Sequence, residues 1–231
     1  MTDICCIGHI TLDKIITPQH ISYMPGGTAY YFSRGMASLH ALTGYKLITA
    51  LGSKEYPIVD ELRKAGIDID VLPSRHTVYF ENRYGENSDN RTQRVLAKAD
   101  PFTIDALHKE NAHFFHLGSL LADDFPPEVI KYLSGKAILS VDAQGYLREV
   151  KGDKVSPIDW PEKREILKYI DILKVNEHEA TVLTGRTIVG VGRKRSSAHT
   201  GQPRVYHTCR RRLLQDTSLS APTNNRCYWL R

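Results

Sequence analysis

The stretch Lys174-Val175-Asn176-Glu177-His178-Glu179 marks the point where a short apolar run changes into a helical pattern. The run Ile172–Val175 is typical of a buried strand, and Glu177–Leu183 has the composition of a helix that stops before Gly185. Asn176 and Glu179 are one helical turn apart, so both side chains can face the same side. Because ligands of open α/β sheets bind beyond the carboxyl ends of strands, this junction is a candidate binding site.

The same change from strand to helix recurs along the first 185 residues. Strands are expected at Ile4–Ile7, Lys46–Ala50, Phe114–Leu117, Ala137–Asp142 and Ile172–Val175. Helices are expected at Thr28–Leu42, Ile58–Ala65, Pro127–Leu133, Glu162–Lys168 and Glu177–Leu183. This alternation predicts an α/β protein with a doubly wound, mostly parallel sheet and helices on both faces.

One region departs from this rhythm. Between residues 69 and 98, Thr77-Val78-Tyr79-Phe80 and Arg94-Val95-Leu96 flank the polar segment Gly85-Glu86-Asn87-Ser88-Asp89-Asn90. Two apolar runs around a polar turn predict a β-hairpin that is separate from the parallel sheet.

The segment after Gly185 differs in charge. Of the 31 basic and 26 acidic residues of the chain, ten basic residues and one acidic residue lie in residues 186–231. The first 185 residues therefore carry a net charge of −4, which argues against a nucleic-acid surface on the main body. One interpretation of the segment is a disordered basic arm that binds nucleic acid.

A shift of reading frame is the other interpretation, and the one we favour. If the first base is dropped from permitted codons for Arg226–Arg231, the shifted frame reads Asp-Ala-Thr-Gly-Cys-Gly. The same shift from Val191 permits Trp-Gly-Val-Asn-Glu-Val-Val-Leu-Ile-Leu-Gly-Ser-Gln-Gly-Ser-Ile, and Leu214–Ser220 permits Cys-Lys-Ile-Pro-Ala-Tyr-Pro. Three such segments in order lead us to interpret residues 186–231 as an out-of-frame tail and not a domain.

These shifted segments resemble the ATP-binding half of the PfkB-type carbohydrate kinases, the ribokinase-like family. In-frame motifs resemble the same family: Cys5-Cys6-Ile7-Gly8-His9-Ile10-Thr11-Leu12-Asp13, Pro25-Gly26-Gly27-Thr28-Ala29, Ser140-Val141-Asp142-Ala143-Gln144-Gly145 and the Asn-x-x-Glu of residues 176–179. The resemblance implies a ribokinase-like core over residues 1–185, with a small β lid at about 12–17 and 69–98. It also implies that the C-terminal ATP-binding part is missing or scrambled.

The resemblance implies a site for a small sugar, polyol or nucleoside, made of Asp13, Gly26, Gly27, Gly118 and Asp142. The carboxylate of Asp13 would accept hydrogen bonds from vicinal hydroxyls, and the glycine pair lets the backbone approach a ligand. Structural alternatives stay open for these residues. They are a turn or cap for Asp13, a plain turn for Gly26 and Gly27, and a strand-end cap for Asp142.

For the phosphate donor, the resemblance implies that Asn176 and Glu179 position phosphate and magnesium, often through water, with ATP and Mg²⁺ as cofactors. A helix-start cap followed by a surface glutamate is the alternative for this pair. The catalytic Asp of the family is expected beyond Arg231. We therefore expect a phosphotransferase family whose present chain is inactive, and a homodimer through the lid is a further expectation.

Composition narrows the remaining classes. Cys5 and Cys6 are adjacent in an apolar run, so the four cysteines do not indicate a disulfide framework or a metal quartet. No signal peptide and no apolar run of about 18 residues is present, so we expect a cytoplasmic protein without membrane or nucleic-acid partners. Two functions stay open beside the kinase: a non-catalytic sugar-binding remnant, and an α/β domain with a basic nucleic-acid-binding arm.

Overall fold

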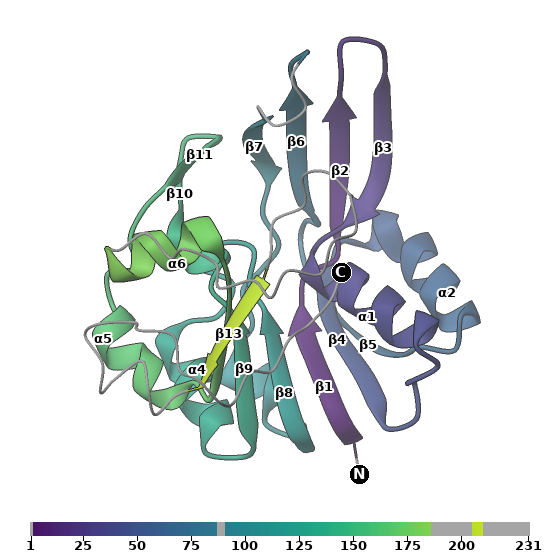
Figure 1. Cartoon of the computed structure of the whole chain (residues 1–231). Coiled ribbons are helices and arrows are strands. Elements are labelled where there is room, and N and C mark those ends of the chain that lie inside the picture. The colour runs from purple at the N-terminus through teal and green to yellow at the C-terminus, as the bar shows by residue number, and fades with distance from the viewer. Residues whose placement is uncertain (1, 87–90, 186–204, 210–231) are drawn as a thin grey trace, which may run out of the picture.

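The larger of two sheets forms the centre of the molecule in this computed structural model, which describes residues 2–86, 91–185 and 205–209 (Figure 1). Its seven strands follow the order β13-β12-β9-β8-β1-β4-β5. They are β1 (Thr2–Gly8), β4 (Tyr45–Leu51), β5 (Asp68–Pro73), β8 (Ala112–Gly118), β9 (Ile138–Asp142), β12 (Ile172–Asn176) and β13 (Val205–Cys209). Every neighbouring pair is parallel except β12 with β13. The expectation of a mostly parallel sheet is confirmed.

Helices cover both faces of this sheet (Figure 1). The α-helices are α1 (Thr28–Ser38), α2 (Tyr56–Lys64), α3 (Ile104–Leu107), α4 (Pro127–Ser134), α5 (Lys163–Ile166) and α6 (Glu177–Thr184). Short 3₁₀ helices are η1 (Ser53–Glu55), η2 (Gly145–Leu147) and η3 (Leu167–Tyr169). Because side chains alternate along a strand, the adjacent Cys5 and Cys6 enter different cores. Cys5 packs in the core that α4 and α6 cover, and Cys6 packs in the core under α1 and α2.

Two predicted helices differ in extent. The helix expected to reach Leu42 ends at Ser38, because His40 adopts a φ of 53°, a left-handed conformation that stops an α-helix. The helix expected over Glu162–Lys168 is divided into α5 and η3. No helix in the described part of the chain has the length and apolar character that crossing a bilayer requires.

The second sheet has six strands in the order β10-β11-β7-β6-β2-β3. It stands above the carboxyl ends of the strands of the larger sheet (Figure 1). Its strands are β2 (Thr11–Ile16), β3 (Ile21–Gly26), β6 (Val78–Tyr84), β7 (Arg91–Ala97), β10 (Arg148–Lys151) and β11 (Lys154–Pro157). We call it the lid sheet. The expected hairpin is confirmed as β6 and β7, which pair antiparallel.

The predicted lid range of 69–98 needs a correction. Residues Asp68–Pro73 are β5, which pairs parallel with β4 at the edge of the larger sheet. Sequence reasoning also missed β3 and the β10–β11 hairpin. That hairpin turns at Gly152, whose φ of 63° is left-handed, within an otherwise charged segment.

Within residues 186–231, the structure describes only β13. It pairs antiparallel with β12, in the register Ile172↔Cys209 to Asn176↔Val205. A strand at this position was not expected for an out-of-frame tail. The other residues of the segment lie outside the described ranges, so the out-of-frame interpretation and the basic-arm alternative both stay predictions.

Candidate functional site

The predicted site residues lie at the carboxyl ends of the strands of the larger sheet, where the lid sheet begins (Figure 1). Gly118 ends β8, Asp142 ends β9 and Asn176 ends β12. Asp13 and Gly26 lie on the paired lid strands β2 and β3. The fold therefore brings together residues that are far apart in the chain, at the edge where α/β sheets bind ligands.

The carboxylate of Asp13 is held in place from its own strand. Thr11 donates a hydrogen bond of 2.7 Å from Oγ1 to Oδ1 of Asp13. On the facing strand, a Cβ atom on Gly26 would lie only 2.5 Å from Oδ2 of Asp13, so the carboxylate can occupy this position only because residue 26 is glycine. Burial raises the pKa of Asp13, and the hydrogen bond from Thr11 and the charges of Arg91 and Arg148 oppose this rise.

Two glycines allow close backbone packing below this carboxylate. Gly27 has a φ of 90°, and a Cβ atom there would lie 2.5 Å from the carbonyl oxygen of His9. A Cβ atom on Gly118 would lie 3.0 Å from Cβ of Thr28. Both glycines therefore have a packing role between strand ends and the start of α1. Contact of Gly26, Gly27 or Gly118 with a substrate stays a prediction.

Asp142 is a buried anion with a cation beside it. Its side chain is 2% exposed, and Lys174 donates a hydrogen bond of 2.5 Å from Nζ to Oδ1. Oδ2 lies 3.8 Å from Nε2 of His116. The backbone oxygen of Asp142 accepts a bond of 2.6 Å from Oγ of Ser119. The structure thus places Asp142 beneath the site, where it holds Lys174 and Ser119, and its contact with a substrate stays a prediction.

Asn176 and Glu179 form a capping box at the start of α6. The backbone N–H of Glu179 donates to Oδ1 of Asn176 at 2.8 Å, and the backbone N–H of Asn176 donates to Oε2 of Glu179 at 2.9 Å. The helix cap, which was the structural alternative to a ligand role for this pair, is therefore present. Oε1 of Glu179 and the amide nitrogen of Asn176 take no part in the box and are the atoms with which a ligand role would be compatible.

Glu179 lies among several charged groups near the start of α6. Burial raises the pKa of Glu179, as does the charge of Asp142, while the hydrogen bond from Asn176 and the charges of Arg148 and Lys174 lower it. Glu179 is half-buried, whereas the structural alternative expected a surface glutamate, and a ligand role for Glu179 stays a prediction.

Sequence reasoning missed three polar residues at this edge: Thr11, Lys174 and Arg148. Thr11 lies two residues before Asp13, and the strand period of two places both side chains on one face, so this contact was predictable. Lys174 lies two residues before Asn176 and could have been found in the same way. Arg148 gave no comparable signal, because it follows an irregular turn.

Three comparisons place this chain among known proteins. Residues 1–208 match the model of the pfkB family carbohydrate kinases, and the chain belongs to this family. The match extends past Gly185, the expected limit of the in-frame resemblance. The fold of this chain is ribokinase-like, as the sequence motifs implied.

The individual relatives are kinases of small molecules. A cytidine kinase from Thermococcus kodakarensis is 29% identical over 199 residues, which cover 80% of this chain and 65% of that relative. A sulfate complex of a pyrophosphate-dependent kinase in the ribokinase family has a TM-score of 0.72 at 32% identity, covering 80% of this chain and 65% of that one. A structure of a pyrophosphate-dependent kinase in the same family, complexed with a pyrophosphate analog and myo-inositol, gives the same TM-score and coverage at 31% identity. The chain thus spans about two-thirds of the length of these relatives.

Proposed function

We propose that this chain binds a small sugar, polyol or nucleoside, and that a chain with the full length of its relatives transfers a phosphoryl group to one hydroxyl of it. The observation that carries the proposal is the carboxylate of Asp13, which accepts a hydrogen bond from Thr11 and packs against Gly26, where no Cβ atom displaces it. Such a carboxylate can accept two hydrogen bonds from vicinal hydroxyls. Family membership and the relatives, which include a cytidine kinase, support this interpretation.

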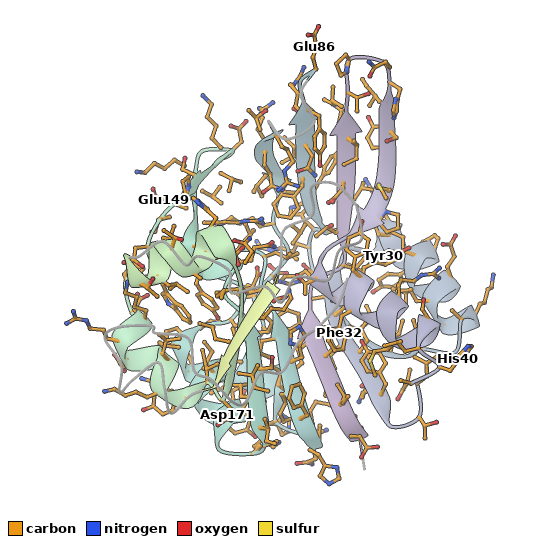
Figure 2. The ribbon with its side chains drawn as sticks, in the orientation of Figure 1. Tyr30, Phe32, His40, Glu86, Glu149 and Asp171 are labelled. Atoms are coloured by element: carbon orange, nitrogen blue, oxygen red, sulfur yellow. The ribbon has the colours of Figure 1, made fainter. Side chains whose placement is uncertain are left out.

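The acceptor is expected to be neutral and rich in hydroxyls. Cytidine and myo-inositol, named with two relatives, share a pair of vicinal hydroxyls and are the two compounds to test first. Tyr30 follows the glycine pair at the end of α1 nearest the lid sheet, where it could flank an acceptor (Figure 2).

The phosphate donor is expected on the side of α6. Oε1 of Glu179 fits a role in holding a hydrated magnesium ion, because it is a half-buried carboxylate oxygen outside the capping box. Magnesium would supply charge neutralisation of the donor phosphates. ATP was the expected donor, and the pyrophosphate dependence of two related kinases makes inorganic pyrophosphate the second donor to compare.

Acceptor binding can be measured on the chain as it is. Isothermal titration with myo-inositol and with cytidine should give saturable binding by the wild type, and Asp13→Ala should abolish it. The matched control is Asp123→Ala, which removes an exposed carboxylate whose partner is Lys98. If both variants bind like the wild type, or if the wild type binds neither compound, the acceptor proposal is wrong.

Phosphoryl transfer needs a chain extended to the length of the relatives, in the frame that the coding DNA supports. Product formation is then measured with ATP and with pyrophosphate, each with and without magnesium. Asp13→Ala should mainly raise KM for the acceptor, and Glu179→Ala should mainly lower kcat and shift the magnesium requirement. Acceptor binding without transfer by any donor would favour the alternative of a non-catalytic sugar-binding remnant.

The homodimer through the lid also stays a proposal. The edge strand β3 exposes Ile21, Tyr23 and Met24 by 58%, 61% and 43%, which is unusual for an edge in contact with water alone. Analytical ultracentrifugation should show a dimer that Tyr23→Lys converts to a monomer. A wild-type monomer at 100 times the assay concentration would contradict it.

A further inference from the structure

Arg148 is a half-buried cation with few structural partners. It is the first residue of β10 and follows η2, whose three residues are all buried. Glu149, the next residue, is labelled in Figure 2, where β10 is drawn above α6 in this view. Nη1 of Arg148 donates a hydrogen bond to the carbonyl oxygen of Leu120 at 3.5 Å, the outer limit for such a bond. Within residues 2–86 and 91–185, no carboxylate forms an ion pair with this guanidinium.

The charge of Arg148 nevertheless reaches both halves of the site. It lowers the pKa of Asp13 on β2 and the pKa of Glu179 on α6, and the charges of Glu179, Asp124 and Asp13 in turn favour the charged guanidinium. Arg91 adds a second positive charge, which lowers the pKa of Asp13 and disfavours the charge on Arg148. The geometry also places Arg148 at the site. Its hydrogen bond reaches Leu120, just after β8, and Cδ1 of Leu120 lies within 3.3 Å of where a Cβ atom on Gly27 would be, at the start of α1.

This arrangement is unfavourable for stability alone. Burial lowers the pKa of Arg148 to about 10, and the charges of Glu179, Asp124 and Asp13 only partly oppose this effect. Other buried or half-buried cations at this edge are compensated directly: Lys174 binds Asp142, and Lys14 binds Glu81 at 2.8 Å. A guanidinium that forms no ion pair within the described residues keeps its N–H donors available to an anionic ligand.

We infer that Arg148 is a phosphate-binding residue, whose guanidinium contacts the oxygens of the phosphoryl group between the acceptor on Asp13 and the donor near Glu179. This inference rests on the proposed function and adds a residue to it. A guanidinium offers a planar pair of N–H donors that matches two phosphoryl oxygens, and a lysine ammonium offers only a point charge. A neutral acceptor alone does not require it.

The phosphoryl group could come from the donor or from the phosphorylated acceptor, and the test includes both. Inorganic pyrophosphate represents the donor, and myo-inositol phosphate and cytidine 5′-phosphate represent the product. Binding of each is measured by isothermal titration to the full chain at low ionic strength. The variants are Arg148→Gln and Arg148→Lys, and the control is Arg83→Gln, which removes an exposed guanidinium of the lid sheet next to Glu81.

We expect Arg148→Gln to weaken the binding of pyrophosphate, of a phosphorylated acceptor or of both by about tenfold or more, because charge-assisted hydrogen bonds are lost. Arg148→Lys should restore part of this affinity, and Arg83→Gln should bind like the wild type. Binding of myo-inositol and cytidine should change less than about twofold in Arg148→Gln. The thermal unfolding midpoint of Arg148→Gln should equal or exceed that of the wild type, which a structural role for the guanidinium would not allow.

Two results would overturn the inference. One is unchanged affinity of Arg148→Gln for all three phosphate compounds, or no binding of any of them by the wild type. The other is a lower unfolding midpoint together with equal losses of phosphate and neutral acceptor. The proposed function fails in a different way: phosphate binding that depends on Arg148, without any binding of myo-inositol or cytidine, would leave the phosphate site standing and remove the acceptor assignment.

Discussion

Gly26 stands directly against the carboxylate of Asp13, on the neighbouring strand of the lid sheet. A Cβ atom at residue 26 would lie 2.5 Å from Oδ2 of Asp13 and 2.8 Å from Oγ1 of Thr11. Gly26→Ala should therefore displace the Asp13 carboxylate from Thr11, destabilise the protein by about 1–3 kcal/mol and abolish acceptor binding. Urea denaturation and acceptor titration measure the two effects.

A second glycine provides the control for this substitution. Gly35 lies inside α1, and a Cβ atom there would meet nothing within 4 Å. Gly35→Ala should stabilise the protein by about 0.5–1 kcal/mol and leave acceptor binding unchanged, because alanine favours the helix. Equal effects of the two substitutions would show that Asp13 does not depend on the space beside Gly26.

The carboxylate of Asp13 should cost stability at neutral pH. Burial raises its pKa above the ordinary value of 3.8, so the folded protein binds the proton more tightly than the unfolded chain. Stability is therefore lost as pH rises from below 3.8 through the folded pKa. Asp13→Asn should raise the unfolding midpoint at pH 7 and lose acceptor affinity, and the difference in midpoint should disappear below pH 3.8. A lower midpoint at pH 7 would contradict this.

The capping box can be separated from a ligand role. Asn176→Ala removes the acceptor for the N–H of Glu179 and should cost about 1 kcal/mol, whereas Asn176→Ser should retain most of the cap. If Asn176 also positions a donor, Asn176→Ser should keep the unfolding free energy and still lower kcat in the extended chain. Wild-type kcat in Asn176→Ser would leave the amide with its capping role alone.

Lys174 should matter far more than an exposed lysine in a similar ion pair. Lys174→Ala leaves the carboxylate of Asp142, which is 2% exposed, without its cation, and should cost about 3 kcal/mol. Lys131→Ala breaks an exposed pair with Glu165 and should cost less than about 1 kcal/mol. Denaturant midpoints of the two variants and of the double variant Lys174→Ala/Asp142→Asn, which should regain stability, measure this difference.

Local features of the fold were predictable from sequence because they depend on near neighbours in the chain. The helical pattern gave the bounds of α2, α4 and α6 within about two residues. The predicted C-terminal end of α1 was wrong because a single backbone conformation decides it. His40 is left-handed and stops α1 early. The assignment of Asp68–Pro73 to the lid failed because strand propensity does not state which sheet a strand joins.

By itself, the sequence determined the α/β class, the order of the strands and helices expected around the larger sheet, the family and the residue types at the strand ends. The reason is that periodicity, turn residues and short motifs are properties of contiguous residues. Only the tertiary structure decided that Arg148 shares an electrostatic environment with Asp13 and Glu179, and that Asp142 lies beneath the site. Those relationships arise when β10 joins the lid sheet through β11, and β9 and β12 pair side by side, and such long-range pairing leaves no mark on local sequence.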